Sequence, residues 1–338
     1  MSSRPTDVRL KSIVPKSIWG CRTLADKRSV VAISDYEFVV AVGNGIMIFD
    51  NNPHGMRKTF LVPSHHDNIV CVTQMSLSFD GKYLSTVVRM KNEDDHAVHM
   101  LVYAVDHIRV EYRSPRLITY RNPSYVVGGG KMEITCTMFS HDSQFIAVGT
   151  NVPAVGVVVL DHRKGDVFQV IPTNSTPNFI TFNPLDPCKL CVTGNNGLFQ
   201  FWRVTAKSIH LAPVVGLRGH SLNYTHHIWI PPYADGLVVA ATSSGLLTIV
   251  LGGEQKGHNV HVFGQSSAAV THTKDAYTEV PLDQHSVIQV MVRGDVLLAL
   301  SPYNEVVAFE VRRVLQSKGI NTLSPTLGLL KRYRLTNV

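Results

Sequence analysis

The chain has 338 residues, of which 44% are hydrophobic and 17% are charged, and its formal net charge is +7. This composition excludes an intrinsically disordered chain, because disorder requires few hydrophobic residues and high charge. Five cysteines, an odd number at low density, give no disulfide framework, and we expect a reducing location because the N-terminus lacks the apolar segment of a secretory signal. We expect no membrane span, because the longest uncharged apolar stretch, 236–253, is interrupted by the polar turn Thr242–Gly245.

A short, almost entirely apolar segment recurs six times along the chain. Its length and its many β-branched residues indicate strands rather than buried helices. The six segments are Phe38–Val42, Tyr83–Val88, Phe145–Gly149, Lys189–Thr193, Leu237–Ala241 and Val296–Leu300. Each is followed by a connection, often a turn with Gly and Asn of the kind that hairpins use, and then by a second apolar strand. The second strands are Ile46–Phe49, Val98–Tyr103, Val157–Leu160, Leu198–Trp202, Leu246–Leu251 and Val306–Phe309.

A further strand precedes most of these pairs, so each unit contains three or four strands. The preceding strands are Met75–Phe79, Cys136–Phe139, Phe179–Phe182 and Val287–Val292. The first apolar segments start 45, 62, 44, 48 and 59 residues apart. A period of about 40–45 residues with four strands per unit is typical of WD-type propellers. No Trp-Asp dipeptide occurs, so the sequence predicts an all-β fold: a divergent WD-repeat β-propeller with six recognisable four-stranded blades.

We expect the propeller to span residues 1–311, with an N-terminal strand at about 12–19. Polar insert loops are expected at about 91–96, 113–130 and 264–286, since insertions on a rigid scaffold fall in loops. The C-terminal segment 312–338 contains a last strand candidate at 329–335. Either six blades close the ring with spare strands, or the chain is the front of a longer protein with an incomplete seven-bladed ring; the sequence favours the second interpretation.

No motif in the chain predicts catalysis, a metal site or a cofactor. Cys188 and Cys191 have the C-x-x-C spacing, but a zinc site needs a second pair or histidine ligands. Adjacent histidines, His65-His66 and His226-His227, point to opposite faces of a strand, so we interpret them as surface or turn residues. A propeller enzyme stays open as a hypothesis, because a triad can assemble from distant residues, but we expect a non-enzymatic protein.

Basic residues gather in two segments and are the candidate contacts with a partner. They are Arg109, Arg113, Arg116 and Arg121 in one insertion and Lys331, Arg332 and Arg334 near the C-terminus. A basic chain is drawn to acidic partners. Nucleic acid is not expected, because the sequence has no RNA-binding signature and no readout helix. These residues form either a solvated face or a contact with an acidic protein surface.

Two segments carry a resemblance to a known family. Ile180–Pro187 followed by Leu190–Phe199, together with Asn223–Trp229, resembles the N-terminal propeller of the cilia- and flagella-associated protein 57 type of axonemal WD-repeat proteins. Sister axonemal WD-repeat proteins share much of this pattern.

The resemblance implies a non-enzymatic scaffold in the axoneme of a cilium or flagellum. The implied partners are tubulin of doublet microtubules, components of inner dynein arms or regulatory complexes, and other WD-repeat ciliary proteins. No membrane partner and no cofactor is implied. The alternative is a soluble cytosolic WD-repeat adaptor that recruits protein partners at the central face of its propeller.

Overall fold

In the computed structural model the described residues form six antiparallel sheets, each made of strands that follow one another in the chain. The structure describes residues 30–34, 36–42, 45–50, 57–61, 69–90, 97–105, 116–121, 134–151, 155–205, 207–212, 222–231, 236–252, 254–255, 260–261, 286–302, 305–311 and 329–334. The sheets are called blades 1 to 6 in chain order.

Blades 1 to 3 contain four strands each. Blade 1 contains β1 (Val30–Ala32), β2 (Glu37–Val42), β3 (Gly45–Asp50) and β4 (Arg57–Leu61). Blade 2 contains β5 (Ile69–Leu77), β6 (Tyr83–Met90), β7 (Ala97–Ala104) and β8 (Arg116–Arg121). Blade 3 contains β9 (Ile134–Phe139), β10 (Phe145–Thr150), β11 (Gly156–Asp161) and β12 (Asp166–Pro172).

Blades 4 to 6 repeat the same order, and blade 5 has one additional short strand. Blade 4 contains β13 (Pro177–Phe182), β14 (Lys189–Gly194), β15 (Phe199–Val204) and β16 (Ile209–Ala212). Blade 5 contains β17 (Tyr224–Trp229), β18 (Leu237–Thr242), β19 (Leu246–Leu251) and β20 (Glu254–Gln255), and β21 (Val260–His261) also pairs with β19. Blade 6 contains β22 (Gln289–Arg293), β23 (Val296–Leu300), β24 (Glu305–Glu310) and β25 (Leu329–Arg334).

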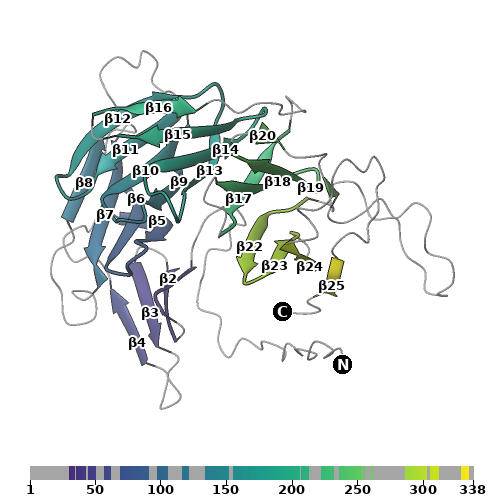
Figure 1. Ribbon diagram of the computed structural model, residues 1–338. Helices are drawn as coiled ribbons and strands as arrows, with labels where there is room; N and C mark the ends of the chain where they lie inside the picture. The colour runs from purple at the N-terminus through teal and green to yellow at the C-terminus, as the bar shows by residue number, and fades with distance from the viewer. Residues whose placement is uncertain are drawn as a thin grey trace, which may run out of the picture.

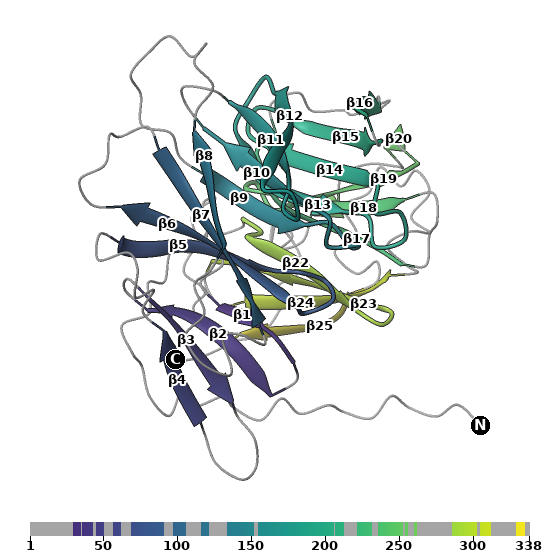
Figure 2. The same ribbon diagram turned by 90° about the vertical axis from the view of Figure 1, so that its left-hand side faces the viewer.

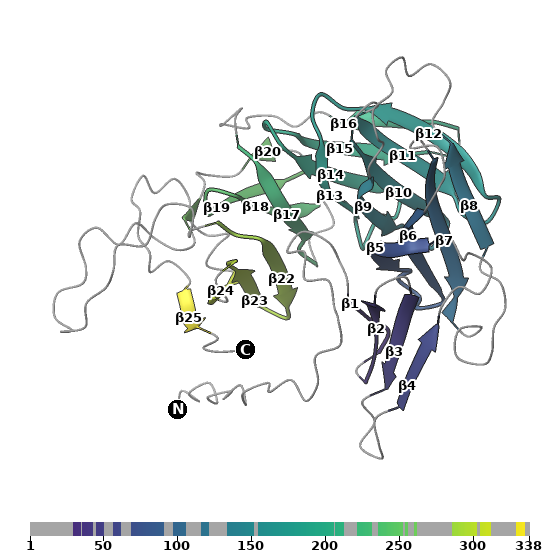
Figure 3. The same ribbon diagram turned by 180° about the vertical axis from the view of Figure 1, so that it is seen from behind.

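The blades follow one another as in a β-propeller. The first strand of each blade lies toward the middle of the molecule and the last strand toward the outside (Figures 1 and 3). First strands of consecutive blades pack side by side from β1 through β5, β9, β13 and β17 to β22 (Figure 2). The predicted all-β fold with six four-stranded blades is confirmed, and the predicted pairs of apolar strands are the second and third strands of the blades, although β15 begins at Phe199 and not at Leu198.

The core lies between blades rather than within one sheet. Separate clusters of buried apolar side chains fill the five junctions from blades 1 and 2 to blades 5 and 6. The middle strands of blades 2 to 5 therefore have a neighbouring blade on each face, and all six residues of β11 and of β18 are buried. Strands buried on both faces have nearly continuous apolar sequences. This burial is the physical reason why the apolar runs in the sequence mark the middle strands.

Polar side chains of the first strands connect neighbouring blades. The Nε2 of Gln74 in blade 2 donates to the carbonyl oxygens of Ile134 (2.9 Å) and Thr135 (2.7 Å) in blade 3. The Nδ2 of Asn178 in blade 4 donates to the carbonyl oxygen of Tyr224 in blade 5 at 2.8 Å. These bonds satisfy polar groups close to the centre, where burial without a partner is costly.

The structure corrects two predictions about elements. The expected insert loop 113–130 contains β8 (Arg116–Arg121), which pairs with β7 as the outermost strand of blade 2. The predicted strand Met75–Phe79 ends at Leu77, so Phe79 lies in the following turn. The segments 12–19, 91–96 and 264–285 lie outside the described residues.

The prediction that His226 and His227 are surface or turn residues is wrong. Both lie in β17, and His227 is fully buried between blades 4 and 5. Its Nε2 is 2.6 Å from the Thr181 hydroxyl oxygen, and its Nδ1 is 2.8 Å from the Thr193 hydroxyl oxygen. The ring of His226 packs on Phe179 with 3.8 Å between ring centroids. Because both ring nitrogens have hydroxyl partners, the histidine can be buried in this apolar junction without an unsatisfied polar atom.

None of the helical segments among the described residues is long and apolar enough to cross a membrane.

Candidate interaction site on the inner-turn rim

Each blade has a turn between its first and second strands, and together these turns form one edge of the propeller, here called the inner-turn rim. In blade 2 the turn is 78–82. The Ser78 hydroxyl donates to Asp80 Oδ1 at 2.7 Å, and the Lys82 amide donates to the same oxygen at 3.2 Å. The Tyr83 amide donates to the Ser78 hydroxyl oxygen at 2.8 Å. Gly81, at φ +70°, supplies the left-handed conformation that closes this turn.

Blade 3 builds the same turn from different residues. The Ser140 hydroxyl donates to Asp142 Oδ1 at 2.5 Å, and the amides of Gln144 and Phe145 donate to Asp142 Oδ1 and to the Ser140 hydroxyl oxygen at 3.1 and 2.9 Å. Ser143 occupies the position of the blade 2 glycine with φ +55°. The two rim turns are therefore held rigid by side chain to backbone bonds of the same kind.

The second residue of each turn carries the exposed apolar surface. Phe79 in blade 2 is 72% exposed, the highest value among the large hydrophobic residues that the structure describes. Its ring centroid is 3.7 Å from that of His141 at the equivalent position of blade 3. Partial burial lowers the pKa of His141, although the adjacent Asp142 carboxylate acts in the opposite direction. The imidazole is therefore neutral at physiological pH. Phe79 and His141 together form an uncharged pair of rings, here called the aromatic step.

Similar exposed side chains follow the rim into other blades. Tyr36 in the turn of blade 1 is 57% exposed, and Leu185 in the turn of blade 4 is 53% exposed. Single exposed apolar residues are ordinary on protein surfaces, whereas a row along one edge marks an interaction surface.

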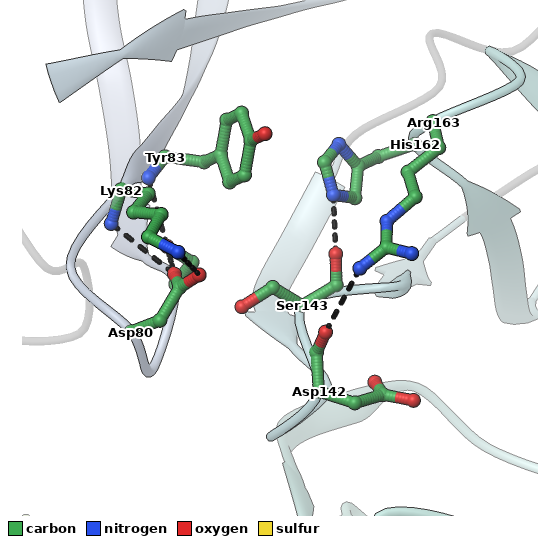
Figure 4. Close-up of polar contacts among 8 residues, drawn as sticks. Asp80, Lys82, Tyr83, Asp142, Ser143, His162 and Arg163 are labelled. Atoms are coloured by element: carbon green, nitrogen blue, oxygen red, sulfur yellow. Dashed lines mark hydrogen bonds and ion pairs between the residues drawn. The ribbon is translucent and has the colours of Figure 1, made fainter. Parts of the chain in front are cut away.

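A buried histidine holds the blade 3 turn that carries His141. His162 follows β11, and its Nε2 is hydrogen-bonded to the carbonyl oxygen of Ser143. The ring of Tyr83 from blade 2 meets His162 edge to face, with centroids 4.8 Å apart (Figure 4). Arg163 Nη2 donates to the carbonyl oxygen of Asp142 at 3.4 Å (Figure 4). These contacts fix the blade 3 turn relative to blade 2.

Asp80 places a negative charge beside the aromatic step. Partial burial raises the pKa of this carboxyl group, but hydrogen bonds from the Ser78 hydroxyl and the Lys82 amide, with the charge of Lys82, lower it overall. The Lys82 ammonium nitrogen is 3.6 Å from Asp80 Oδ2. The rim at blades 2 and 3 thus combines an apolar anchor with charged side chains, which suits recognition of a protein surface.

The structure separates the two thiols of the C-x-x-C spacing. Cys188 is exposed, whereas Cys191 is buried. Burial raises the pKa of the Cys191 thiol well above its usual value, although Lys189 lowers it, so this thiol stays protonated and unreactive. Across the described residues, no group of three or more His, Cys, Asp or Glu side chains is arranged to hold a metal ion.

The basic residues predicted as contacts fall on two different blades. Arg116 and Arg121 are the first and last residues of β8 in blade 2, and Lys331, Arg332 and Arg334 lie in β25 of blade 6. These strands are the outermost of their blades, so the structure does not bring the two groups together (Figure 1). Arg109 and Arg113 lie outside the described residues.

Sequence reasoning missed the Phe79–His141 pair. Phe79 was assigned to the end of a strand, and its partner lies 62 positions away. The one local signal was an aromatic residue between Ser78 and Asp80-Gly81, where a turn normally has a polar residue or proline.

Comparisons with known proteins give one relative in sequence and a shared fold. No family model matches the chain. It is 27% identical over 143 residues to cilia- and flagella-associated protein 43 of Chlamydomonas reinhardtii, an alignment that covers 38% of this chain and 8% of that protein. The chain therefore matches only a small part of that relative's length.

Among solved structures, a chain in the crystal structure of the mitotic checkpoint complex has a TM-score of 0.58 over 92% of this chain and 85% of its own length. Its sequence identity of 10% shows a shared fold alone. The chain thus has a β-propeller fold and a weak similarity to a cilia- and flagella-associated protein, which supports the coarser part of the resemblance seen in the sequence.

Proposed function

We propose that this chain is a non-enzymatic scaffold of the ciliary or flagellar axoneme that binds partner proteins through its inner-turn rim. The observation that carries the proposal is Phe79, which is 72% exposed and packs in a tilted contact against His141 of the next blade. Burying an apolar side chain of this size contributes about 1.5–3 kcal/mol. Aromatic anchors of this kind dominate the energy of protein interfaces.

The rigidity of the rim supports the same proposal. The Ser78 and Ser140 turns present Phe79 and His141 in a fixed geometry before any partner arrives. A preformed surface loses less conformational entropy on binding than a flexible one. Tyr36 and Leu185 extend the apolar row into blades 1 and 4.

The similarity to cilia- and flagella-associated protein 43 supports the axonemal setting. We propose that the partners are tubulin of doublet microtubules and axonemal proteins such as inner dynein arm or regulatory complex components and other WD-repeat ciliary proteins. The net charge of +7 suits the acidic surface of tubulin. In this proposal the outer strands β8 and β25 supply a second, charge-based contact.

The test is fractionation of flagella from cells that express tagged chain, first with detergent and then with rising salt. We expect retention through detergent and release at high salt. Phe79→Ser is expected to release the chain at lower salt, because it removes the anchor without disturbing the turn bonds. Leu211→Ser is the matched control, since Leu211 is 51% exposed but lies on the outer strand β16.

Complete extraction by detergent alone would rule out the axonemal scaffold. In that case the cytosolic adaptor that recruits peptides at the central face would become the leading interpretation. Equal effects of the Phe79 and Leu211 variants would show that the rim is not the binding surface.

A further inference from the structure

Blades 2 to 5 each pack against two neighbouring blades, whereas blades 1 and 6 each pack against one. The described residues form five clusters of buried apolar side chains, one at each junction from blades 1 and 2 to blades 5 and 6. The described strands of blades 1 and 6 make no contact as extensive as those at these five junctions. Blades 1 and 6 are therefore the two ends of an arc of blades (Figures 1 and 3).

The face of blade 1 that points away from blade 2, here called the blade 1 end face, carries a row of apolar side chains. Val30, Val40 and Met47 are register partners on β1, β2 and β3. The adjacent row, which contains Val39 and Ile48, packs against blade 2. Because successive side chains of a strand point to opposite faces, the Val30 row lies on the face that has no neighbouring blade. Val30 is 53% exposed.

The blade 6 end face, which points away from blade 5, has the same character. Met291, Leu298 and Ala308 are register partners on β22, β23 and β24. The adjacent row, which contains Val290 and Ala299, packs against blade 5. Met291 is 48% exposed. At every other junction such apolar rows are covered by a facing blade, so both end faces have the chemistry of a surface that needs an apolar cover.

The segment 12–19 has the composition of such a cover. It is the strand that the sequence predicts before the first blade, and it lies outside the described residues. In an extended strand Ile13 and Trp19 point to one side, whereas Val14 and Ile18 point to the other. Strands that are apolar on both faces belong between two apolar layers.

The position of this segment in the chain keeps it close to the end faces. Ten residues, 20–29, join it to Val30, and ten residues span at most about 35 Å. A segment on such a short tether has an effective concentration of about 1 mM. Blade 6 already has four consecutive strands with β25 outermost, so the segment is not needed as the outer strand of the last blade. Pro15, which has no amide hydrogen, suits a strand that is held mainly by side-chain packing.

We propose that residues 12–19 form a strand that inserts between the end faces of blades 1 and 6 and closes the ring. Ile13 and Trp19 cover one end face, and Val14 and Ile18 cover the other. This inference does not depend on the proposed function, because the end faces are separate from the inner-turn rim.

The test is hydrogen exchange of the full chain, read by mass spectrometry of the peptide that contains residues 12–19. We expect its amides to exchange at least tenfold more slowly in the full chain than in a synthetic peptide of residues 1–29. Met291→Asp, which is far from the segment in the sequence, is expected to abolish this protection, because it places a charge on the blade 6 end face. Val30→Asp is expected to do the same from blade 1.

Val70→Asp is the matched control for these variants. Val70 is 49% exposed and lies on a first strand, β5, but it belongs to blade 2. We expect this variant to leave exchange in residues 12–19 within twofold of the unmodified chain. Unchanged exchange in the buried strands β11 and β18 shows in each variant that the blades stay folded.

A reciprocal measurement changes the segment and leaves the blades intact. Trp19→Asp is expected to make oxidation of the Met291 thioether by hydrogen peroxide at least threefold faster, because the cover is lost. Ser3→Asp adds the same charge outside the segment and is expected to leave the oxidation rate within twofold.

The proposal is wrong if residues 12–19 exchange as fast in the full chain as in the synthetic peptide, or if the Met291 and Val70 variants have equal effects. Protection that increases with protein concentration would instead assign the end faces to a second copy of the chain. The Phe79→Ser variant separates this inference from the proposed function, since it is expected to keep the protection of residues 12–19 whether or not it is retained in axonemes.

Discussion

The bonds between blades give the sharpest test of how this propeller is held together. Gln74 is 4% exposed, and its Nε2 donates to two carbonyl oxygens of blade 3 at 2.9 and 2.7 Å. Replacing it with methionine keeps the length and most of the volume of the side chain but removes the donor. A neutral hydrogen bond contributes about 1 kcal/mol net, and a desolvated acceptor that loses its partner costs about 1–3 kcal/mol. We therefore expect Gln74→Met to reduce the free energy of unfolding by about 2–4 kcal/mol.

The assay is urea unfolding of the full chain, followed by far-ultraviolet circular dichroism and by tryptophan fluorescence, so that a departure from two-state behaviour is detected. Gln289→Met is the control, because this substitution makes the same change of residue at an exposed position of a first strand, β22. We expect it to stay within about 0.5 kcal/mol of the unmodified chain. If Gln74→Met is as stable as this control, the bonds between first strands do not hold neighbouring blades together.

Three further predictions follow from burial and backbone geometry. Gly236→Ala is expected to destabilise the chain more than Gly294→Ala in thermal unfolding. Both glycines have positive φ, but only at Gly236 would a Cβ meet side-chain atoms, at 2.8 and 2.9 Å. Equal losses of thermal stability would contradict this close contact at Gly236. Burial raises the pKa of Tyr103 to about 12, so the folded state keeps the phenol proton above the ordinary tyrosine pKa of 10.0. The stability that this group contributes is complete below pH 10 and is lost as the pH rises toward 12, which lowers the free energy of unfolding by about 2 kcal/mol. Tyr103→Phe is expected to remove this part of the pH dependence of the free energy of unfolding. Iodoacetamide is expected to label exposed Cys188 in the native chain and buried Cys191 only after unfolding, as read by peptide mass spectrometry; native labelling of both would place Cys191 outside the core.

The middle strands were predictable because their environment leaves a mark on local sequence. A strand between two blades is apolar at nearly every position, as β11 and β18 are. The first strands carry a weaker signal, since one side faces the centre and polar residues alternate with apolar ones. This weaker pattern is why the strand at Met75 was extended to Phe79. The outermost strand β8 has no continuous apolar run and was interpreted as part of a loop.

The candidate site was less predictable from the sequence than the strands. Its basic part was predicted from residue type alone, and the structure places that part on outer strands of two separate blades. Its aromatic part depends on two turns that are far apart in the sequence. Charge clusters are visible in a sequence, whereas a surface shared by two blades is not.

By itself the sequence determined the class of fold, the number of recognisable blades and the middle strands of each, because two-sided burial imposes apolar runs at a regular spacing. Only the tertiary structure decided that His227 is a core residue with two threonine partners, that Gln74 spans two blades, and that Phe79 packs against His141. Each of these contacts joins residues from different blades. Their partners are set by how whole sheets pack, and no local pattern of residues encodes that packing.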